Sequence, residues 1–260
     1  MEGKKVIADK MYDLVLYNYH TKKMAFRVLK SPTVVKNPIY NYFYEKEMHN
    51  MMKKYLEVPF RVMIENTNRC NADCVFCPHK NMKRKVGTMP FSFFKEIIGE
   101  CISLDINYAT VYGFGEPLLD TNIIKKVEYA KSEGIERVTT NTNAQHLTKE
   151  KAKGFIEFGL DEIYISLDAA TEGTYKKIRP NLDFKKVEKN VLNLIKIREE
   201  IGGNRPVVIL SYVESDANKN ETQDFISKWK RVVDNISISQ IHNWTGDINH
   251  NTQEFYYRTK

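Results

Sequence analysis

The sequence predicts an α/β protein in which strands and helices alternate. From about residue 60 onward, short apolar runs alternate with amphipathic stretches, and three of these stretches end at a glycine. Such alternation is typical of a parallel sheet, because each crossover returns the chain to the same edge. Right-handed crossovers curl this sheet toward a barrel. Six repeats are too few for a closed eight-stranded barrel, so we expect a partial (β/α)6 TIM-like barrel that is open on one side.

Each strand is predicted from a short apolar or alternating run with turn residues nearby. The expected strands cover residues 60–65, 108–113, 137–141, 162–168, 206–213 and 236–241. The expected helices cover residues 90–103, 122–133, 149–158, 184–201 and 221–233.

Helix ends and helix faces support these boundaries. Gly134, Gly159 and Gly202 follow three of the helical stretches, where a glycine commonly ends a helix. In the helix over 90–103, Cys101 shares one face with Phe94 and Ile98, at helical spacing. We therefore expect Cys101 to be a buried thiol and no metal ligand.

The chain is expected to have three parts. Residues 1–57 lack the strand–helix alternation and form an N-terminal helical extension, in which Pro32 and Pro38 separate two short amphipathic helices. Residues 58–242 form the core domain, and residues 243–260 form a C-terminal tail. The extension is rich in aromatic residues and methionine, a composition that indicates packing rather than a binding surface.

Composition narrows the class of protein. The net charge is +7 and the pI is about 9.0, but the basic residues are spread along the chain apart from 80–85. This charge alone does not specify nucleic acid, and no added nucleic-acid-binding module is evident. No stretch is long and apolar enough to span a membrane, and no signal peptide begins the chain. Clustered free cysteines indicate a reducing, cytoplasmic location.

The cysteine run CNADCVFC contains the most informative pattern. Cys70, Cys74 and Cys77 are spaced C-x3-C-x2-C on a loop that follows the first strand. A cubane [4Fe–4S] cluster normally takes four thiolates, so three leave one iron open for a ligand. A structural zinc site completed by His79 is the alternative. A second C-x2-C knuckle, which zinc sites usually contain, is absent from the sequence.

Polar residues follow the strands at their carboxyl ends, where parallel barrels place their chemistry. Alternation puts Glu65, Ser166 and Asp168 on the inner face, opposite the apolar residues that meet the helices. Asn143 follows the third strand. The second strand ends in Tyr112-Gly113-Phe114-Gly115-Glu116-Pro117, a turn with exposed carbonyl groups that suits a cationic ligand. The fifth strand does not sort into two faces.

Together, the cysteine loop, the Gly-Glu-Pro turn and the Ser-Leu-Asp segment resemble the radical S-adenosylmethionine (radical SAM) superfamily. The resemblance runs from about residue 58 to residue 242. It implies a [4Fe–4S] cluster whose open iron binds S-adenosylmethionine. It also implies reductive cleavage of S-adenosylmethionine to a 5′-deoxyadenosyl radical that abstracts hydrogen from a substrate. A flavodoxin or ferredoxin would supply the electrons.

The resemblance also assigns the cofactor contacts. Gly115 and Glu116 match the turn that holds the methionine ammonium, although Phe114 stands where the family often has glycine. Phe76 matches the aromatic residue near the adenine. The remaining matches are Asn143 near the nucleoside, Ser166 at the ribose or carboxylate, and Arg179 at the methionine carboxylate.

Three residues are expected to face the barrel mouth as candidate catalytic residues: Glu65, Asp168 and His242. His242 closes the last strand on the open side of the barrel, and the matched cofactor residues lie on the first four strand–helix units. We therefore expect His242 to face the substrate.

The resemblance extends to members that continue into a cysteine-rich auxiliary-cluster domain of the SPASM type. This sequence stops at Lys260 with no further cysteines, so it is expected to be a truncated relative or to work without an auxiliary cluster. The favoured function is a radical enzyme acting on a peptide, a sugar or another small metabolite. The alternatives are a radical enzyme that modifies RNA, and a non-catalytic iron–sulfur or zinc protein.

Overall fold

The computed structural model describes residues 58–241. The chain divides into the units Met1–Phe60 and Arg61–Lys260, and the description below concerns the second unit. The predicted N-terminal helices, the predicted tail and His242 lie outside the described residues.

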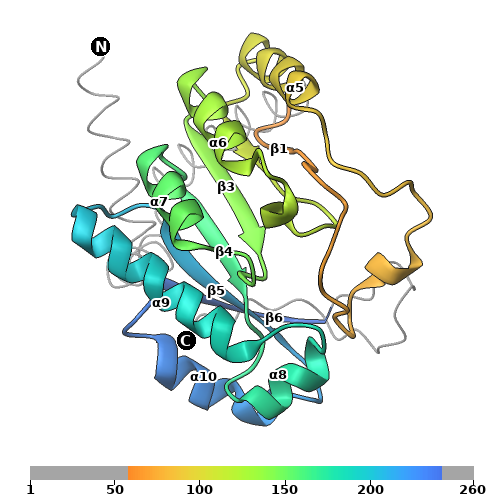
Figure 1. Ribbon diagram of the computed structural model, residues 1–260, viewed down its shortest axis with the longest axis vertical. Coiled ribbons are helices and arrows are strands. Elements are labelled where there is room, and N and C mark those ends of the chain that lie inside the picture. Colours follow the sequence, from red (N-terminus) through yellow and green to blue (C-terminus); the bar gives the residue numbers. More distant parts are fainter. Residues whose placement is uncertain (1–57, 242–260) are drawn as a thin grey trace, which may run out of the picture. The chain divides into compact units, whose positions relative to one another are not determined.

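The described residues form one parallel sheet whose strands pair in sequence order, β1-β2-β3-β4-β5-β6 (Figure 1). The strands are β1 (Val62–Met63), β2 (Tyr108–Thr110), β3 (Arg137–Thr142), β4 (Glu162–Ser166), β5 (Val207–Glu214) and β6 (Asn235–Gln240). The first and last strands do not pair with each other, so this sheet is open. The predicted α/β class and the open partial barrel are confirmed.

Helices connect the strands and lie along one face of the sheet (Figure 1). They are α5 (Phe91–Ser103), α6 (Ile123–Ser132), α7 (Lys149–Glu157), α8 (Glu172–Ile178), α9 (Phe184–Ile201) and α10 (Thr222–Trp229). Short 3-10 helices η1 (Pro78–Asn81), η2 (Pro117–Leu119) and η3 (Lys219–Glu221) lie in the loops. None of the described helices is both long and apolar enough to cross a membrane.

The core lies between the sheet and these helices. Residues that point toward the helices, in the strands or directly after them, are almost all fully buried: Ile64, Ala109, Val111, Val138, Ile163, Ile165, Val208, Leu210 and Tyr212. Alternation places their neighbours on the opposite face, which we call the inner face. Cys101 packs with Phe94 and Ile98 on the buried side of α5, as predicted.

Capping residues set the helix boundaries. Asp183 accepts a hydrogen bond from the Lys186 backbone at the start of α9. Gly202 ends this helix with a φ of 73°, a left-handed conformation that favours glycine, and its N–H donates to the Glu199 carbonyl at 2.9 Å. The boundaries of α9 agree with the prediction for this reason.

Apart from α10, which ends at Trp229 rather than residue 233, and β4, which ends at Ser166 rather than residue 168, the structure differs from the prediction in two main respects. β1 and β2 are shorter than predicted, because the chain leaves the sheet early to form the loops of the site. The second difference is α8, which was not predicted. It has seven residues, too few for a helical period to show, although the Thr171 side chain caps it by accepting from the Thr174 N–H.

Candidate active site

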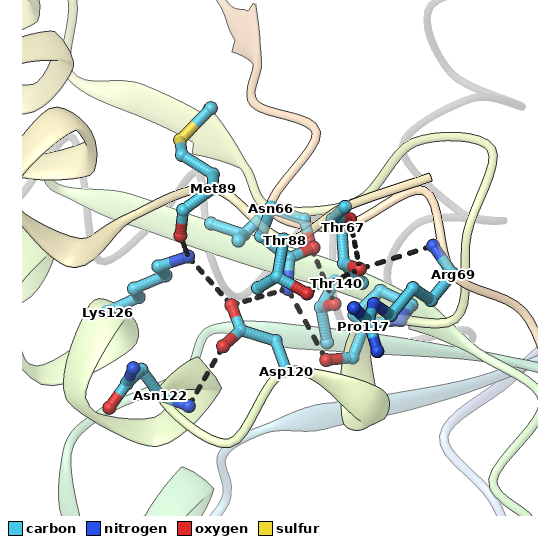
Figure 2. Close-up of polar contacts among 12 residues, drawn as sticks. Asn66, Thr67, Arg69, Thr88, Met89, Pro117, Asp120, Asn122, Lys126 and Thr140 are labelled. Atoms are coloured by element: carbon cyan, nitrogen blue, oxygen red, sulfur yellow. Dashed lines mark hydrogen bonds and ion pairs between the residues drawn. The ribbon is translucent and has the colours of Figure 1, made fainter. Parts of the chain in front are cut away.

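A buried polar network anchors the loop that carries the cysteines (Figure 2). Lys126 Nζ donates to Asp120 Oδ2 at 2.7 Å and to the Met89 carbonyl at 2.8 Å, and both charged side chains are inaccessible to solvent. Asn66 Nδ2 donates to the same Asp120 oxygen at 3.1 Å and to the Pro117 carbonyl at 3.3 Å. The Met89 N–H donates to the Asn66 carbonyl at 2.8 Å. The network therefore fixes both ends of the segment 66–89.

A second set of bonds closes this segment just inside its two ends. Thr67 Oγ1 donates to the Gly87 carbonyl at 2.9 Å, and Thr67 bridges to Thr88 (Figure 2). Asn68 Nδ2 donates to the Lys85 carbonyl at 2.9 Å, while its Oδ1 accepts from the Gly87 N–H at 2.7 Å. These bonds therefore hold in place the two chain segments between which the cysteine loop extends, beyond the carboxyl end of β1.

The three cysteines lie on this loop as free, partly exposed thiols. The Cys77 N–H donates to the Cys74 carbonyl at 3.0 Å, which forms a tight turn between them. Cys70 and Cys77 are both close enough to Cys74 to act on it electrostatically. The loop therefore brings the three thiols within electrostatic range of one another.

The alternative fourth ligand is engaged elsewhere. His79 Nε2 lies 2.8 Å from the Asn68 carbonyl oxygen. Among residues 58–241, no three His, Cys, Asp or Glu side chains are arranged to hold a single metal ion. A cubane cluster takes each thiolate on a different iron, so its ligands need not converge on one point.

The Gly115 turn packs directly on the cysteine loop. A Cβ added at Gly115 would lie 2.4 Å from the Thr67 carbonyl oxygen and 2.6 Å from that of Arg69, so a side chain does not fit. The Glu116 N–H donates to the Arg69 carbonyl at 2.7 Å. Glycine is needed here because two main chains meet.

The Glu116 carboxylate is buried and faces neighbouring strand ends. Its oxygens accept from the Leu118 N–H at 3.0 Å, the Thr142 hydroxyl at 2.5 Å and the Asn143 N–H at 2.7 Å. Burial raises the pKa of Glu116, while these hydrogen bonds act in the opposite direction. The side chain thus joins the ends of β2 and β3.

Asn143 and Ser166 lie at the ends of β3 and β4. Asn143 Nδ2 donates to Asn71 Oδ1 at 3.0 Å, which ties this strand end to the cysteine loop. Ser166 Oγ donates to Asn141 Oδ1 at 3.2 Å, and both residues are half-buried on the inner face. Phe76 is half-buried on the loop, between the second and third cysteines.

Glu65 holds the turn after β2 from the side of β1. Its Oε1 accepts from the Phe114 N–H at 2.9 Å, and Arg84 donates to both carboxylate oxygens, at 2.5 and 3.1 Å. The hydrogen bonds from Arg84 hold the pKa of Glu65 below its ordinary value. Both carboxylate oxygens are therefore engaged within the protein.

Asp168 and Arg179 form a buried pair, whereas the sequence placed Asp168 at the open mouth. Asp168 is fully buried, and its Oδ2 accepts from Arg179 Nε at 2.8 Å and Nη2 at 2.5 Å. Its Oδ1 accepts from the Val213 N–H at 2.7 Å. Asp168 does not follow the alternation of the strand, because β4 ends at Ser166 and Asp168 has a left-handed φ of 56°.

Comparison with known proteins identifies the family of this chain. Residues 64–232 match the model described as the Radical SAM superfamily. The chain belongs to the radical SAM superfamily. Members of this superfamily are enzymes that use a [4Fe–4S] cluster and S-adenosylmethionine.

Two curated relatives match part of this radical SAM chain. A tungsten-containing aldehyde ferredoxin oxidoreductase cofactor-modifying protein of Pyrococcus furiosus is 28% identical over 160 residues, which cover 60% of this chain and 44% of that protein. The GTP 3′,8-cyclase of Limosilactobacillus fermentum is 34% identical over 140 residues, which cover 50% of this chain and 40% of that enzyme. The chain spans about half the length of the curated relatives it matches.

A solved structure supports the radical SAM fold. SuiB of Streptococcus suis, crystallised with the precursor peptide SuiA, aligns with a TM-score of 0.62 and 18% identity. The alignment covers 84% of this chain and 48% of the SuiB chain.

The donor set fits the cluster that the radical SAM superfamily uses. Cys70, Cys74 and Cys77 would supply three thiolates, which are soft ligands suited to iron–sulfur clusters. Tyr175 supports this fit, because its buried hydroxyl has no hydrogen-bond partner and lies close enough to Cys74 to interact electrostatically. A bound group that accepts from it would account for a buried donor without a protein partner.

Sequence reasoning missed two groups of site residues. The register aligns Ser166 with Ser211 and Ser211 with Ser237, which makes a half-buried row of hydroxyls on the inner face. The buried residues Leu210 and Tyr212 flank Ser211, and this alternation is the signal that was overlooked.

The second group is the network around Lys126 and Asp120. A lysine within an amphipathic helix gives no sign in the sequence that it is buried.

Proposed function

We propose that this chain contains the core of an enzyme that cleaves S-adenosylmethionine reductively and abstracts hydrogen from a substrate. One electron enters S-adenosylmethionine, the C5′–S bond breaks, and methionine leaves with the electron pair on sulfur. The remaining 5′-deoxyadenosyl radical takes a hydrogen atom from a C–H bond and becomes 5′-deoxyadenosine. A flavodoxin or ferredoxin supplies the electron, in a reducing compartment such as the cytoplasm.

The observation that carries this proposal is the contact between the cysteine loop and the Gly115 turn. Three free thiols lie on a loop whose main chain leaves no room for a side chain at Gly115. When bound, the cluster would supply the electron and an iron that holds S-adenosylmethionine. The loop and the turn would then hold its methionine end between them.

Other residues would orient the rest of S-adenosylmethionine. Main-chain groups of the Gly115–Glu116 turn suit the methionine ammonium, because carbonyl oxygens accept from a cation. The half-buried Ser166 hydroxyl suits the ribose or carboxylate, and Asn143 the nucleoside. Phe76 offers an apolar surface for the adenine. Such positioning is what a protein contributes to cofactor chemistry.

The candidate catalytic residues take different parts in this proposal. Glu65 and Asp168 have both carboxylate oxygens engaged, so we assign them to positioning the Phe114 turn and Arg179. His242 lies outside the described residues, and we retain it as the residue facing the substrate. Changing His242 to Ala is then expected to spare S-adenosylmethionine cleavage without substrate while reducing substrate turnover.

The proposed substrate is a peptide, a sugar or another small metabolite. Support comes from two similar proteins. One curated relative is named for cyclising GTP, and the structure of SuiB, which shares the fold, contains a precursor peptide. The hydroxyl row Ser166–Ser211–Ser237 gives the inner face uncharged hydrogen-bonding groups suited to a polar substrate.

The test is anaerobic reconstitution with iron and sulfide, followed by dithionite and S-adenosylmethionine. We expect methionine and 5′-deoxyadenosine in equal amounts from the wild type. Cys74→Ala should form neither product, and Cys101→Ala should match the wild type. Reconstituted protein with four irons that forms no 5′-deoxyadenosine would refute the proposed activity.

A further inference from the structure

The Arg179 guanidinium contacts a predicted cluster ligand directly. Its Nη1 donates to Cys74 Sγ at 3.2 Å. Arg179 is only 6% exposed, so water does not screen this contact. The guanidinium stays charged because arginine is not deprotonated in proteins, and the Asp168 carboxylate pairs with it.

Asp168 fixes the direction in which Arg179 donates. It takes the Nε and Nη2 donors, which leaves Nη1 directed at the sulfur. Asp168 is itself held by the Val213 N–H at 2.7 Å, and Asn218 Nδ2 donates to the Asp168 carbonyl at 2.8 Å. A planar guanidinium that is held at two of its nitrogens presents its third nitrogen in a fixed direction.

The end of α8 brings Arg179 to the cysteine loop. The Val75 N–H donates to the Ile178 carbonyl at 3.1 Å, and Asn181 Nδ2 donates to Asp73 Oδ2 at 2.9 Å. These bonds lie on either side of Arg179 in the sequence. The segment 178–181 is thus bound along the loop between Cys70 and Cys77.

We infer that Arg179, oriented by Asp168, donates to the sulfur of Cys74 when Cys74 is an iron ligand, and thereby raises the reduction potential of the cluster. Reduction adds negative charge to the cluster, and a cation with a hydrogen bond to a ligand sulfur stabilises the reduced state. This inference rests on the proposed function. It makes Arg179 a positioning residue that acts through Cys74, and it predicts an effect without S-adenosylmethionine.

The experiment compares the midpoint potential of the reconstituted cluster in wild type, Arg179→Gln and Arg179→Lys, without S-adenosylmethionine and then with it. The control is Arg198→Gln. Arg198 is a guanidinium of similar burial (7% exposed) that pairs with Asp234. Electron paramagnetic resonance (EPR) at a series of potentials gives the reduced fraction, and iron and sulfide analysis checks cluster content.

Arg179→Gln should lower the ratio of reduced to oxidised cluster about tenfold at a given potential, which for one electron equals about 59 mV. The midpoint potential of Arg179→Lys should lie between those of Arg179→Gln and the wild type. Lysine keeps the positive charge but lacks the forked guanidinium that Asp168 holds in place. Arg198→Gln should match the wild type.

An unchanged potential without S-adenosylmethionine, together with weaker S-adenosylmethionine binding, would overturn the inference and assign Arg179 to the methionine carboxylate. If Arg179→Gln does not assemble a cluster, wild type labelled with 15N-arginine decides the matter. A 15N hyperfine coupling to the reduced cluster supports the contact, and its absence overturns it. A wild type without four irons would instead refute the proposed function.

Discussion

The Glu116 carboxylate and the Asn143 N–H join the ends of two adjacent strands across a distance of 2.7 Å. Glu116 is 3% exposed and Asn143 5% exposed, so this bond is shielded from water. It sets the position of the turn after β2 relative to the segment after β3. In the proposed function, these two segments hold opposite ends of S-adenosylmethionine.

Glu116→Gln is expected to destabilise the protein by about 1–3 kcal/mol. The carboxylate accepts three hydrogen bonds, whereas a glutamine amide would place an NH2 group against one of the three donors. Urea denaturation measures the free energy of unfolding. Glu157→Gln, at an exposed position on α7, is the control and should leave it unchanged. Equal stability in the two variants would contradict the bridging role of Glu116.

The contribution of Glu65 to stability should depend on pH. Its folded pKa is lowered, chiefly by the hydrogen bonds from Arg84, so the folded protein holds the charged form more strongly than the unfolded chain. Its stabilising effect is then present above the unfolded pKa and lost as the pH falls through the folded pKa. The stability difference between wild type and Glu65→Gln should therefore shrink from about pH 7 to about pH 3 in urea titrations. A stability difference between the two proteins that grows toward acid pH would contradict this prediction.

Each cysteine of the triplet should be required for the cluster. Changing Cys70, Cys74 or Cys77 to Ala leaves two thiolates, and we expect loss of the brown absorbance near about 400 nm and of bound iron. Cys101→Ala should keep both, because Cys101 is buried in α5. Iron retained in a single-alanine variant of the triplet would show that another group replaces the missing thiolate.

Lys126→Met should destabilise the protein by about 3–5 kcal/mol, because it leaves Asp120 buried without its cation. Since this pair also holds the ends of the cysteine loop, iron incorporation should fall as well. Lys196→Met is the matched control: Lys196 pairs with Glu200 on the exposed side of α9, and its loss should cost about 0.5 kcal/mol or less. Similar losses for both variants would mean that burial adds nothing to the pair.

The sequence predicted the six strands and their parallel sheet because short apolar runs alternate with helical stretches along the chain. It predicted the end of α9 well because the terminal Gly202 is a local signal. It did not predict α8, whose seven residues are too short for a period. The predicted site therefore included Arg179 but not its contact with Cys74.

The side-chain environments of the site depend on contacts between distant residues. Alternation placed Ser166 on the inner face, where the structure has it, but it does not apply to Asp168, where the backbone turns left-handed. The burial of Lys126 depends on Asp120 and Met89, whose positions become defined only when the sheet assembles.

The most direct test of the central claim is the EPR spectrum of the reduced, reconstituted protein before and after addition of S-adenosylmethionine. Three cysteine ligands leave one iron of a [4Fe–4S] cluster open, so S-adenosylmethionine should bind that iron and change the spectrum. We expect four irons and four sulfides per chain, and a clear change in the EPR signal when S-adenosylmethionine is added. Bound zinc in place of iron, or a spectrum that S-adenosylmethionine leaves unchanged, would contradict it.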